Sequence, residues 1–216
     1  MIRLKEDTLE ILSYTKTNVN PLEIVSVANN RNVSINLRDA FPFPYSKKDA
    51  ESWIEYASSK PETSFHIRVD GKFAGGIALM RKNDIHSRTF ELGYWLGETY
   101  WGKGLMSRAV KLVLCYAYES ERINPLRIEA VVKTKHLGSR RVLEKNGFVF
   151  EGTLRSSAVK EGVIYDMAMY SVIKSDITST PSSSSKIGGG AVVGTAVLAT
   201  MLLLFLYTRR KKLGIR

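Results

Sequence analysis

Within residues 1–174, apolar residues recur at helical spacing in some segments and alternate with polar residues in others. This pattern predicts a domain of mixed helices and strands. Four segments have helical spacing of their apolar residues or a helix-start signal, and they span residues 21–28, 47–58, 105–118 and 138–146. Pro21 stands near the start of the first helix, while Ser46 and Asp49 form a capping sequence for the second. Gly147 follows the fourth helix and is typical of a helix end.

Short apolar or alternating segments between these helices predict strands. They span residues 8–14, 63–69, 72–80, 89–96, 127–133, 148–151 and 163–172. Asp70 and Gly71 separate the second strand from the third, which predicts a tight hairpin. The sequence contains no internal repeat. We therefore expect one α/β (α+β) domain over residues 1–174.

The chain changes character after Lys174. Residues 175–187 are rich in Ser, Thr and Pro and predict a flexible linker. Residues 188–207 carry no charge over 20 positions, enough for a helix of about 30 Å, the thickness of a bilayer core. The aromatic and basic residues around the start of the tail 208–216 are typical of an interfacial anchor. These features predict a transmembrane helix, with a buried soluble helix as the alternative.

The position of this segment suggests a topology. It ends nine residues before the C-terminus, and residues 1–10 do not read as a secretory signal peptide, so we favour a tail anchor with residues 1–187 in the cytosol. The positive-inside rule argues the other way, because the tail carries five positive charges. The opposite orientation, however, needs a folded domain to cross a membrane without a signal. The short basic tail favours the mitochondrial outer membrane or the peroxisome, with the endoplasmic reticulum as an alternative.

Composition narrows the classes of partner. The chain has 32 Lys and Arg against 21 Asp and Glu, a formal charge of +11 that favours phosphates or acidic lipid headgroups. Residues 1–174 contain no basic stripe with interleaved aromatics, so a nucleic-acid partner is not expected. Cys115 is the lone cysteine, which excludes an internal disulfide and a Cys-rich zinc site, and we expect no metal. It lies on the apolar stripe of the helix 105–118, so we expect it in the core.

The segment YWLGETYWGKGLMSRAV, residues 94–110, combines a strand end, a glycine turn and an apolar helix. Gly102 and Gly104 let backbone N–H groups approach an anion, and the helix N-terminus adds a partial positive charge. Lys103 and Arg108 would add further positive charge. The segment therefore predicts a phosphate cradle, with a plain structural turn as the alternative. It matches neither the dinucleotide fingerprint nor the loop of nucleotide hydrolases.

Four motifs in order give the chain a resemblance to a known family. They are NLRDAFPFPYSKKDAESWI at 36–54, FELGYWLGETYWGKGLMSRAV at 90–110, SRRVLEKNGFVFEGTLR at 139–155, and Tyr165-Asp166 with Tyr170. Over residues 20–173 the chain resembles the GNAT N-acetyltransferase superfamily, most closely the branch of ribosomal-protein N-terminal acetyltransferases (RimJ/RimL-like). The resemblance implies a GNAT fold: a mostly antiparallel sheet, splayed mid-way, with helices on both faces and acetyl-CoA held in the splay.

The resemblance also implies a cofactor site. In the family the glycine turn binds the pyrophosphate of acetyl-CoA, mostly through backbone groups, and carried over these contacts fall on Gly102, Lys103, Gly104, Leu105, Met106 and Ser107. A backbone N–H of the splayed strand, at Tyr94, Trp95 or Leu96, is implied to polarise the thioester carbonyl. The side chains of Trp95 and Trp101 are expected in the cofactor groove, with a core position as the alternative.

The sequence departs from the family pattern at two positions. Thr99 stands where the superfamily often has Gln or Arg. His136 stands where the Asn of an Asn-x-x-Ser element would lie, although its Ser is retained as Ser139. His136 could contact the cofactor arm or hold the helix start through a ring nitrogen, and an exposed loop histidine is the alternative. The departure leaves cofactor affinity open.

Acetyl transfer to an amine needs a base and a proton for the departing thiolate. Glu91 is the acidic side chain within the strand 89–96 and is the expected base, acting through water, with a solvent-facing carboxylate as the alternative. Ser139 matches the family position that faces the sulfur and is the expected acid. Tyr165 and Tyr100 are the alternative acids.

We therefore expect an N-acetyltransferase that moves acetyl from acetyl-CoA directly to a primary amine, tethered to a lipid bilayer. A protein N-terminus is the favoured acceptor and a small-molecule amine the second. A membrane-anchored GNAT-fold binding protein without catalysis is the alternative from another class, which the departures at Thr99 and His136 would support. The loops 38–45 and 156–164 are expected to set the choice of acceptor.

Overall fold

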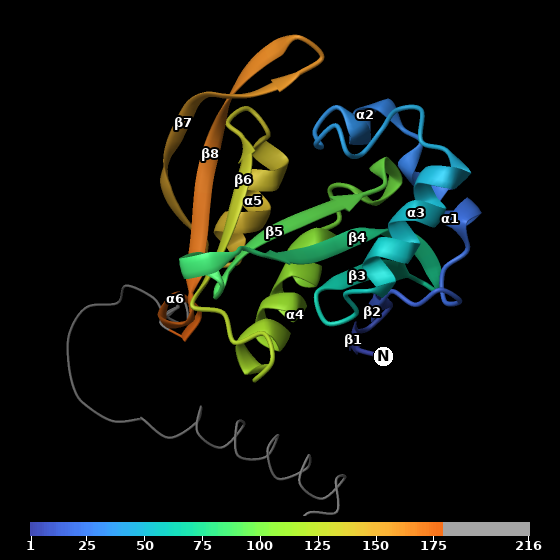
Figure 1. The fold of residues 1–216 in the computed structure, drawn as a ribbon, viewed down its shortest axis with the longest axis horizontal. Coiled ribbons are helices and arrows are strands. Elements are labelled where there is room, and N and C mark those ends of the chain that lie inside the picture. Colours follow the sequence, from blue (N-terminus) through green and yellow to red (C-terminus); the bar gives the residue numbers. More distant parts are fainter. Residues whose placement is uncertain (179–216) are drawn as a thin grey trace, which may run out of the picture. The chain divides into compact units, whose positions relative to one another are not determined.

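The computed structural model describes residues 1–178 of the chain. Within them an eight-stranded sheet has the order β1-β2-β3-β4-β5-β6-β8-β7 (Figure 1). The strands are β1 Arg3–Glu6, β2 Leu9–Ser13, β3 Ser64–Val69, β4 Lys72–Arg81, β5 Thr89–Leu96, β6 Arg127–Lys133, β7 Val149–Lys160 and β8 Val163–Ile173. Neighbouring strands pair antiparallel, except that β5 and β6 run parallel. The predicted, mostly antiparallel sheet is confirmed for this part of the chain.

Helices cover both faces of the sheet. They are α1 Pro21–Ala28, α2 Arg31–Ser34, α3 Lys47–Ser58, α4 Leu105–Glu119, α5 Leu137–Lys145 and α6 Lys174–Thr178, with short 3-10 turns η1 Asp84–His86 and η2 Glu98–Tyr100. One apolar core packs α4 and α5 against the sheet, and a second packs α1 and α3 against it. Leu96 belongs to the first core and Trp95 packs on the second, because successive strand residues point to opposite faces.

All the predicted helices and strands are present, and the structure adds elements that the hydrophobic pattern does not show. β1 is an edge strand whose residues are mostly exposed, and α2 is a four-residue helix capped by Asn30. β7 continues to Lys160, beyond its predicted end near Glu151. The hydrophobic pattern does not reveal this extension, because most of the side chains of β7 are exposed. Regular structure also continues past Lys174, where we expect the domain to end, since α6 follows β8 directly.

The short contact between β5 and β6 shapes the molecule. These strands pair only through Thr89–Arg127, Phe90–Ile128 and Glu91–Glu129, although each strand continues beyond that point. Figure 1 shows β5 and β6 diverging after this contact. We call the last pair, Glu91 with Glu129, the vertex of the divergence. The splay that the family resemblance implies is thus present, and it opens after three residue pairs.

Two carboxylates meet at the vertex on one face of the sheet, because ladder partners share a face. The Glu129 side chain is buried, and Lys82 and Arg127 pair with it, the Arg127 Nε at 3.2 Å. Arg127 also pairs with Glu151 and holds the pKa of that carboxyl down at about 2. A buried carboxylate needs such partners, since an unpaired buried charge is costly. The Arg127–Glu151 pair thus links β6 to β7 across the intervening strand β8.

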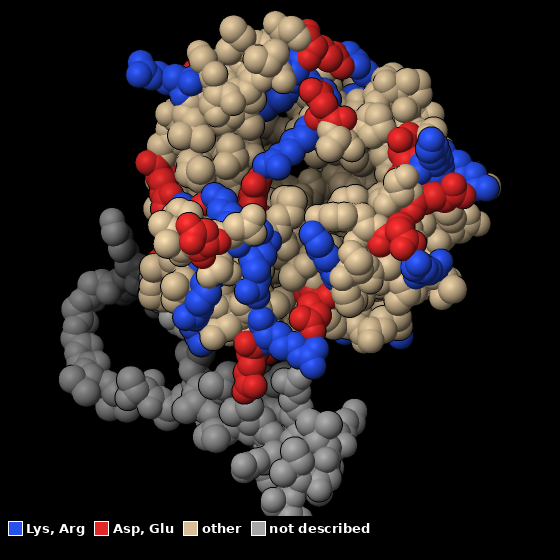
Figure 2. All heavy atoms as spheres, viewed as in Figure 1, with Lys and Arg blue, Asp and Glu red and all other residues tan. Residues whose placement is uncertain are grey.

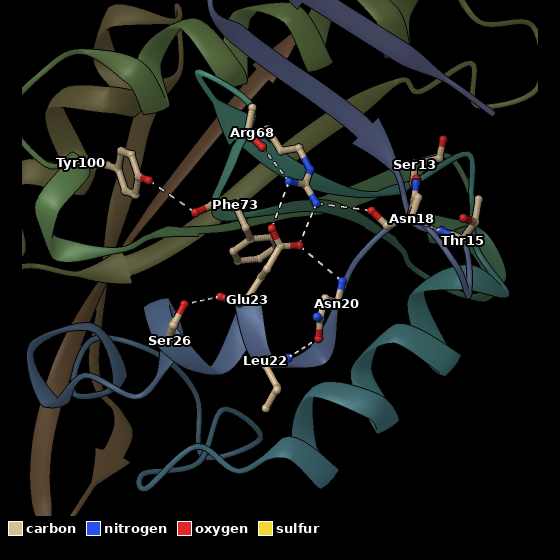
Figure 3. A network of polar contacts seen from close by, with 11 residues as sticks. Ser13, Thr15, Asn18, Asn20, Leu22, Glu23, Ser26, Arg68, Phe73 and Tyr100 are labelled. Carbon is tan, nitrogen blue, oxygen red and sulfur yellow. Dashed lines mark hydrogen bonds and ion pairs between the residues drawn. The ribbon is translucent and has the colours of Figure 1, made fainter.

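A polar network fixes α1 against the sheet (Figure 3). Asn20 caps the helix by accepting from the Leu22 N–H at 2.9 Å, and the Glu23 side chain reaches back to the Asn20 N–H at 3.4 Å. Arg68 of β3 donates to both Glu23 oxygens, at 3.3 and 2.9 Å, and to the Gly71 carbonyl at 2.7 Å. The guanidinium lowers the pKa of Glu23. The helix start and the β3–β4 hairpin therefore form one unit.

Cys115 is exposed, so its expected place in the core was wrong. The residues of α4 that are buried are Leu105, Met106, Ala109, Val110, Val113, Leu114 and Ala117. Cys115 follows Leu114 by one residue, a rotation of about 100° around the helix axis, which carries its side chain off the buried stripe. The periodicity of α4 is confirmed, and the thiol lies beside its stripe.

Among residues 1–178 no helix is both long and apolar enough to cross a membrane. The predicted flexible linker 175–187 is wrong over residues 175–178, which belong to α6. Residues 179–187 of the linker, the predicted transmembrane helix 188–207 and the tail 208–216 lie outside the described residues. The membrane predictions therefore stay predictions of the sequence.

His66 is a fully buried imidazole in the second core. Its ring lies 5.1 Å from the Tyr14 ring and 6.3 Å from the Phe73 ring, measured between centroids. Within the described residues neither ring nitrogen has a hydrogen-bond partner. Burial, and then the nearby charge of Arg68, lowers the pKa of His66 from 6.5 to about 4. The folded protein therefore holds this ring neutral.

We predict that His66 makes the fold sensitive to acid. The unfolded chain takes up a proton at this ring below about pH 6.5 while the folded protein does not, so stability falls as the pH drops from 6.5 toward 4. The expected slope is about 1.4 kcal/mol per pH unit. Urea unfolding at several pH values should show this slope in the wild type and in an exposed-site control, His86→Gln, and a flatter profile in His66→Phe. An unchanged slope in His66→Phe contradicts the prediction.

Candidate functional site

A large groove opens where β5 and β6 diverge. Its walls come from β4, β5 and β6, from α3, from the N-termini of α4 and α5, and from residues 31–45, which we call the strap. Figure 2 shows this face hollowed, with charged side chains of both signs around the hollow. The predicted site residues that line the groove are Glu91, Tyr94, Trp95, Leu96, Gly102, Gly104, Leu105, Met106, Ser107, His136 and Ser139. Lys103 and Tyr165 are not part of this lining.

The turn before α4 has the geometry of an anion cradle. Gly102 and Gly104 have φ angles of 73° and 72°, a left-handed conformation that favours glycine. Apart from the glycine and its chain neighbours, no atom of residues 1–178 lies within 4 Å of the place where a Cβ would sit on either glycine, so the space above them is open. The first backbone bond of α4 runs from the Arg108 N–H to the Gly104 carbonyl, which leaves the preceding amides without partners inside the helix. These residues fit a pyrophosphate.

The side chains near the cradle contribute less charge than the sequence suggests. The Arg108 guanidinium pairs with Glu6 at 3.2 Å and with Asp7 at 2.9 Å, both on the β1–β2 hairpin. The Lys103 Nζ lies 6.0 Å from the centre of the Tyr100 ring. The expectation that Arg108 adds charge to the cradle was therefore wrong, because its partners lie on a hairpin that the sequence pattern does not reveal.

One edge of β5 faces the groove without a strand partner. Pairing with β6 ends at Glu91, so backbone groups farther along that edge point into the divergence. The Leu96 carbonyl accepts from the Trp101 indole N–H at 2.8 Å. The Trp95 ring packs against Phe41 and Phe73, with centroids 5.1 and 5.9 Å away. Trp95 thus belongs both to the groove wall and to the second core.

The start of α5 holds the predicted acid. The Ser139 Oγ lies 2.7 Å from the Tyr94 hydroxyl, which also donates to the Ser139 carbonyl at 3.2 Å. Burial raises the pKa of Tyr94, so this phenol stays protonated. The His136 Nδ1 accepts from the Ser139 N–H at 3.2 Å and caps the helix. His136 therefore does hold the helix start through a ring nitrogen, and it lines the groove instead of projecting from an exposed loop.

Neutral imidazole is the form that this cap requires, because a protonated Nδ1 cannot accept a hydrogen bond. Burial lowers the pKa of His136, with the Lys133 charge adding to the effect, so the accepting form persists at neutral pH. The substitution of His for Asn is thus compatible with an ordered start of α5.

Glu91 lies on the groove wall at the vertex. Its carboxylate pairs with the guanidinium of Arg38, which reaches it from the strap. The Glu91 side chain is 20% exposed and the Arg38 side chain 69% exposed. The sequence marks Arg38 only as the first residue of an expected acceptor loop, and no spacing rule connects it to Glu91.

The strap crosses the divergence and is fastened on both sides. On the β5 side Asn32 of the strap and Asn30, which directly precedes the strap, donate to Glu98, each at 2.8 Å. On the other side Arg31 pairs with Glu161 at the tip of the β7–β8 hairpin, and Asp39 pairs with Lys160 at 2.8 Å. The strap therefore roofs the end of the groove above Glu91. Sequence reasoning missed these pairs, because their partners are far apart in the chain.

Tyr165 lies near the strap and away from the predicted acid. The Lys133 Nζ sits 3.8 Å from the centre of the Tyr165 ring and donates to the Ile35 carbonyl at 2.7 Å. Met167, two residues farther along β8, lines the groove instead. The structure thus brings Glu91 and Ser139 into one groove and leaves Tyr165 outside its lining. The catalytic roles of these residues stay predictions.

Comparison with known proteins finds one family. Residues 11–149 match the model described as an acetyltransferase (GNAT) domain. The chain is 30% identical over 172 residues to the protein named "Probable N-acetyltransferase YjcK" from Bacillus subtilis, covering 73% of this chain and 94% of that protein. It is 28% identical to a ribosomal-protein-serine acetyltransferase of Escherichia coli, covering 50% of this chain and 59% of that one. A spermidine N(1)-acetyltransferase of Escherichia coli is also 28% identical, over 49% of this chain and 55% of that one.

Solved structures share the fold. An acetyltransferase of the GNAT family from Bacillus anthracis superposes with a TM-score of 0.69 at 18% identity, covering 81% of this chain and 99% of that one. A ribosomal L7/L12 alpha-N-protein acetyltransferase in complex with coenzyme A superposes with a TM-score of 0.66 at 21% identity, over 78% and 95% of the two chains. The described residues therefore have the mixed sheet and flanking helices of these proteins.

We predict that Gly104→Asp abolishes binding of acetyl-CoA while the fold is retained. The carboxylate would fill the open space above the turn and repel the pyrophosphate, and Asp is one of the few residues with a side chain that adopt the left-handed conformation of Gly104. Isothermal titration should show at least a tenfold weaker affinity. Gly71→Asp is the matched control, because Gly71 has a φ of 74° and the same open space but lies in the β3–β4 turn. Unchanged affinity in a folded Gly104→Asp protein would refute the cradle.

Proposed function

The chain belongs to the acetyltransferase (GNAT) family and is an N-acetyltransferase that uses acetyl-CoA, and on this premise we propose that its acceptor is the α-amine of a protein N-terminus. The proposal rests on the position of Glu91, a carboxylate at the vertex of the groove whose cradle and Ser139–Tyr94 pair belong to the same lining. Glu91 already binds one cation, the Arg38 guanidinium, and this supports a role in receiving the acceptor ammonium. The acetyltransferase of Escherichia coli named for ribosomal-protein serine supports the same acceptor class.

Glu91 acts first in the proposed reaction. Bound acetyl-CoA supplies an activated acetyl thioester. Glu91 accepts the proton of the acceptor ammonium, directly or through a water, and leaves a neutral amine in position to attack. An N-terminal amine has a pKa near 8, against about 10.4 for a lysine side chain, so a carboxylate is an adequate base for it. Backbone N–H groups on the open edge of β5 orient and polarise the carbonyl under attack.

Ser139 and Tyr94 then serve the leaving thiolate. The Tyr94 phenol stays protonated, and its one hydrogen can go to the Ser139 carbonyl at 3.2 Å or to the Ser139 Oγ at 2.7 Å. When the phenol donates to Oγ, the serine hydrogen is free to point into the groove. A thiol with a pKa near 8.5 is a fair leaving group, so a weak acid suffices. His136 fixes this serine by capping α5 at its backbone N–H. The proton removed at Glu91 is in this way balanced by one delivered at the sulfur.

Two other functions have some support. A polyamine is the second candidate acceptor, because the chain is also similar to a spermidine N(1)-acetyltransferase. A binding protein without catalysis is the alternative from another class. Its main sequence argument, the histidine at position 136, is weakened by the intact helix cap that His136 provides.

Glu91→Gln should lower kcat by about 100-fold or more, since a positioned base typically contributes 10²–10⁴. The amide keeps the size of the side chain but cannot accept the ammonium proton. Thiol release from acetyl-CoA with a short peptide as acceptor measures the rate, and the acidic limb of the pH–rate profile should disappear. The control is Glu55→Gln, an exposed glutamate of α3 paired with Lys16. A fall of less than about threefold means that another group is the base.

We also propose that residues 188–207 tether the enzyme to a membrane as a tail anchor, with the catalytic domain in the cytosol. The uncharged 20-residue segment and the basic residues after it support this arrangement. The mitochondrial outer membrane and the peroxisome are the favoured sites, and the endoplasmic reticulum is the alternative. A cytosolic orientation would give the groove access to acetyl-CoA and to newly made protein N-termini.

The full chain should resist alkaline extraction from membranes, and protease added to intact organelles should remove its catalytic domain. Replacing Val197 and Leu198 with Arg should move the protein to the soluble fraction, because each charge is costly at the bilayer centre. Ser183→Arg, in the predicted linker, should leave it in the membrane. A domain that is protected until detergent is added inverts the proposed topology.

A further inference from the structure

We propose that Arg38 selects the acceptor: it favours an amine with a carbonyl group on the neighbouring carbon, as at a peptide N-terminus, over the amine of a polyamine or a lysine side chain. This inference deepens the proposed function and rests on it, because it takes Glu91 as the group that receives the acceptor ammonium. The ion pair of Arg38 and Glu91 is the feature that would distinguish a peptide N-terminus from the other amines.

The Arg38–Glu91 pair differs from the other charged contacts of the groove. Three further carboxylates line the groove, and each has another partner: Asp39 pairs with Lys160, Glu62 with Arg122, and Asp49 caps α3 through Ser46. Among the charged contacts of residues 1–178, only that of Glu91 joins the strap to the vertex, where the acceptor has to arrive. Arg38 therefore occupies the position that an incoming cation would take.

A substrate ammonium can displace Arg38 from the Arg38–Glu91 ion pair. The Arg38 side chain is 69% exposed, and an ion pair with such an exposed partner contributes little stability. The backbone that carries it is held more firmly. The Phe41 N–H donates to the Arg38 carbonyl at 2.9 Å, and the Phe41 ring packs against Trp95 with centroids 5.1 Å apart. The Arg38 guanidinium is thus exposed, while the backbone that carries it is anchored through Phe41.

The chemistry of a peptide N-terminus matches this pair. Its ammonium nitrogen and its first carbonyl oxygen are three bonds apart, so a neighbouring carboxylate and guanidinium can bind both at once. The ammonium replaces the guanidinium on Glu91, and the displaced Arg38 donates to the carbonyl oxygen. A diamine or a lysine side chain presents only methylene groups at that place. A diamine also brings a second positive charge, which Arg38 repels.

The test compares two acceptors in five proteins. The acceptors are the tripeptide Ser-Ala-Ala amide, with a free N-terminus, and 1,4-diaminobutane. The proteins are the wild type, Arg38→Gln, Arg38→Lys, Arg38→Glu and Arg3→Gln. The last is the matched control, because Arg3 also forms an exposed pair with a glutamate, Glu10, but lies on β1. Thermal unfolding of each variant confirms that it is folded.

Arg38→Gln should reduce the ratio of kcat/KM for peptide over diamine by at least tenfold, chiefly through KM for the peptide. Arg38→Glu should reduce it further and should raise kcat/KM for the diamine, because a second carboxylate now faces its second ammonium. Arg38→Lys should give an intermediate ratio of kcat/KM for peptide over diamine, since lysine keeps the positive charge but lacks the planar guanidinium with its paired N–H donors. Arg3→Gln should leave the ratio unchanged.

The inference is overturned if Arg38→Gln and Arg38→Glu slow both acceptors by the same factor, which would make Arg38 a structural residue. It also falls if the ratio does not change. In either case a wild type that acetylates the peptide leaves the proposed function intact. A wild type that acetylates the diamine but not the peptide overturns the proposed acceptor, and this inference with it.

Discussion

The three-residue ladder between β5 and β6 is the constraint on which the site depends. Parallel strands of full length would pair all along and leave no room for a ligand between them. Here the ladder ends at Glu91 and Glu129, and the two strands continue into different packing partners, β5 against β4 and β6 against β8. On one side of the opening β1 to β5 pair antiparallel, and on the other side β6, β8 and β7 pair antiparallel. The opening is therefore a rigid feature of the backbone.

This ladder also places two carboxylates, Glu91 and Glu129, on neighbouring strands. The two carboxylates have different partners and different exposure. Glu129 is buried and neutralised from within the domain by Lys82 and Arg127. Glu91 is the more accessible of the two, and its partner Arg38 comes from the strap. One carboxylate of the vertex is thus neutralised by two cations of the sheet region, while the other pairs with an exposed guanidinium of the strap.

Local signals made much of the fold predictable. The capping pair Ser46 and Asp49 and the helical stripe of α4 depend on residues close in sequence, and both are present as predicted. The glycine turn was also recognisable, because a left-handed backbone favours a residue without a Cβ. β1 was not predictable, since an exposed edge strand needs no apolar alternation. The Arg38–Glu91 contact was not predictable either, because 53 residues separate its partners and only the folded sheet brings them together.

The strap and the vertex differ in how they respond to the surrounding solution. The Arg31–Glu161 and Asp39–Lys160 pairs that fasten the roof each include a largely exposed partner, and such pairs are screened over about 8 Å at physiological ionic strength. The vertex depends on backbone hydrogen bonds and buried side chains, which salt affects far less. Rising ionic strength therefore weakens the ion pairs of the strap, including Arg38–Glu91, more than it weakens the β5–β6 ladder that frames the groove.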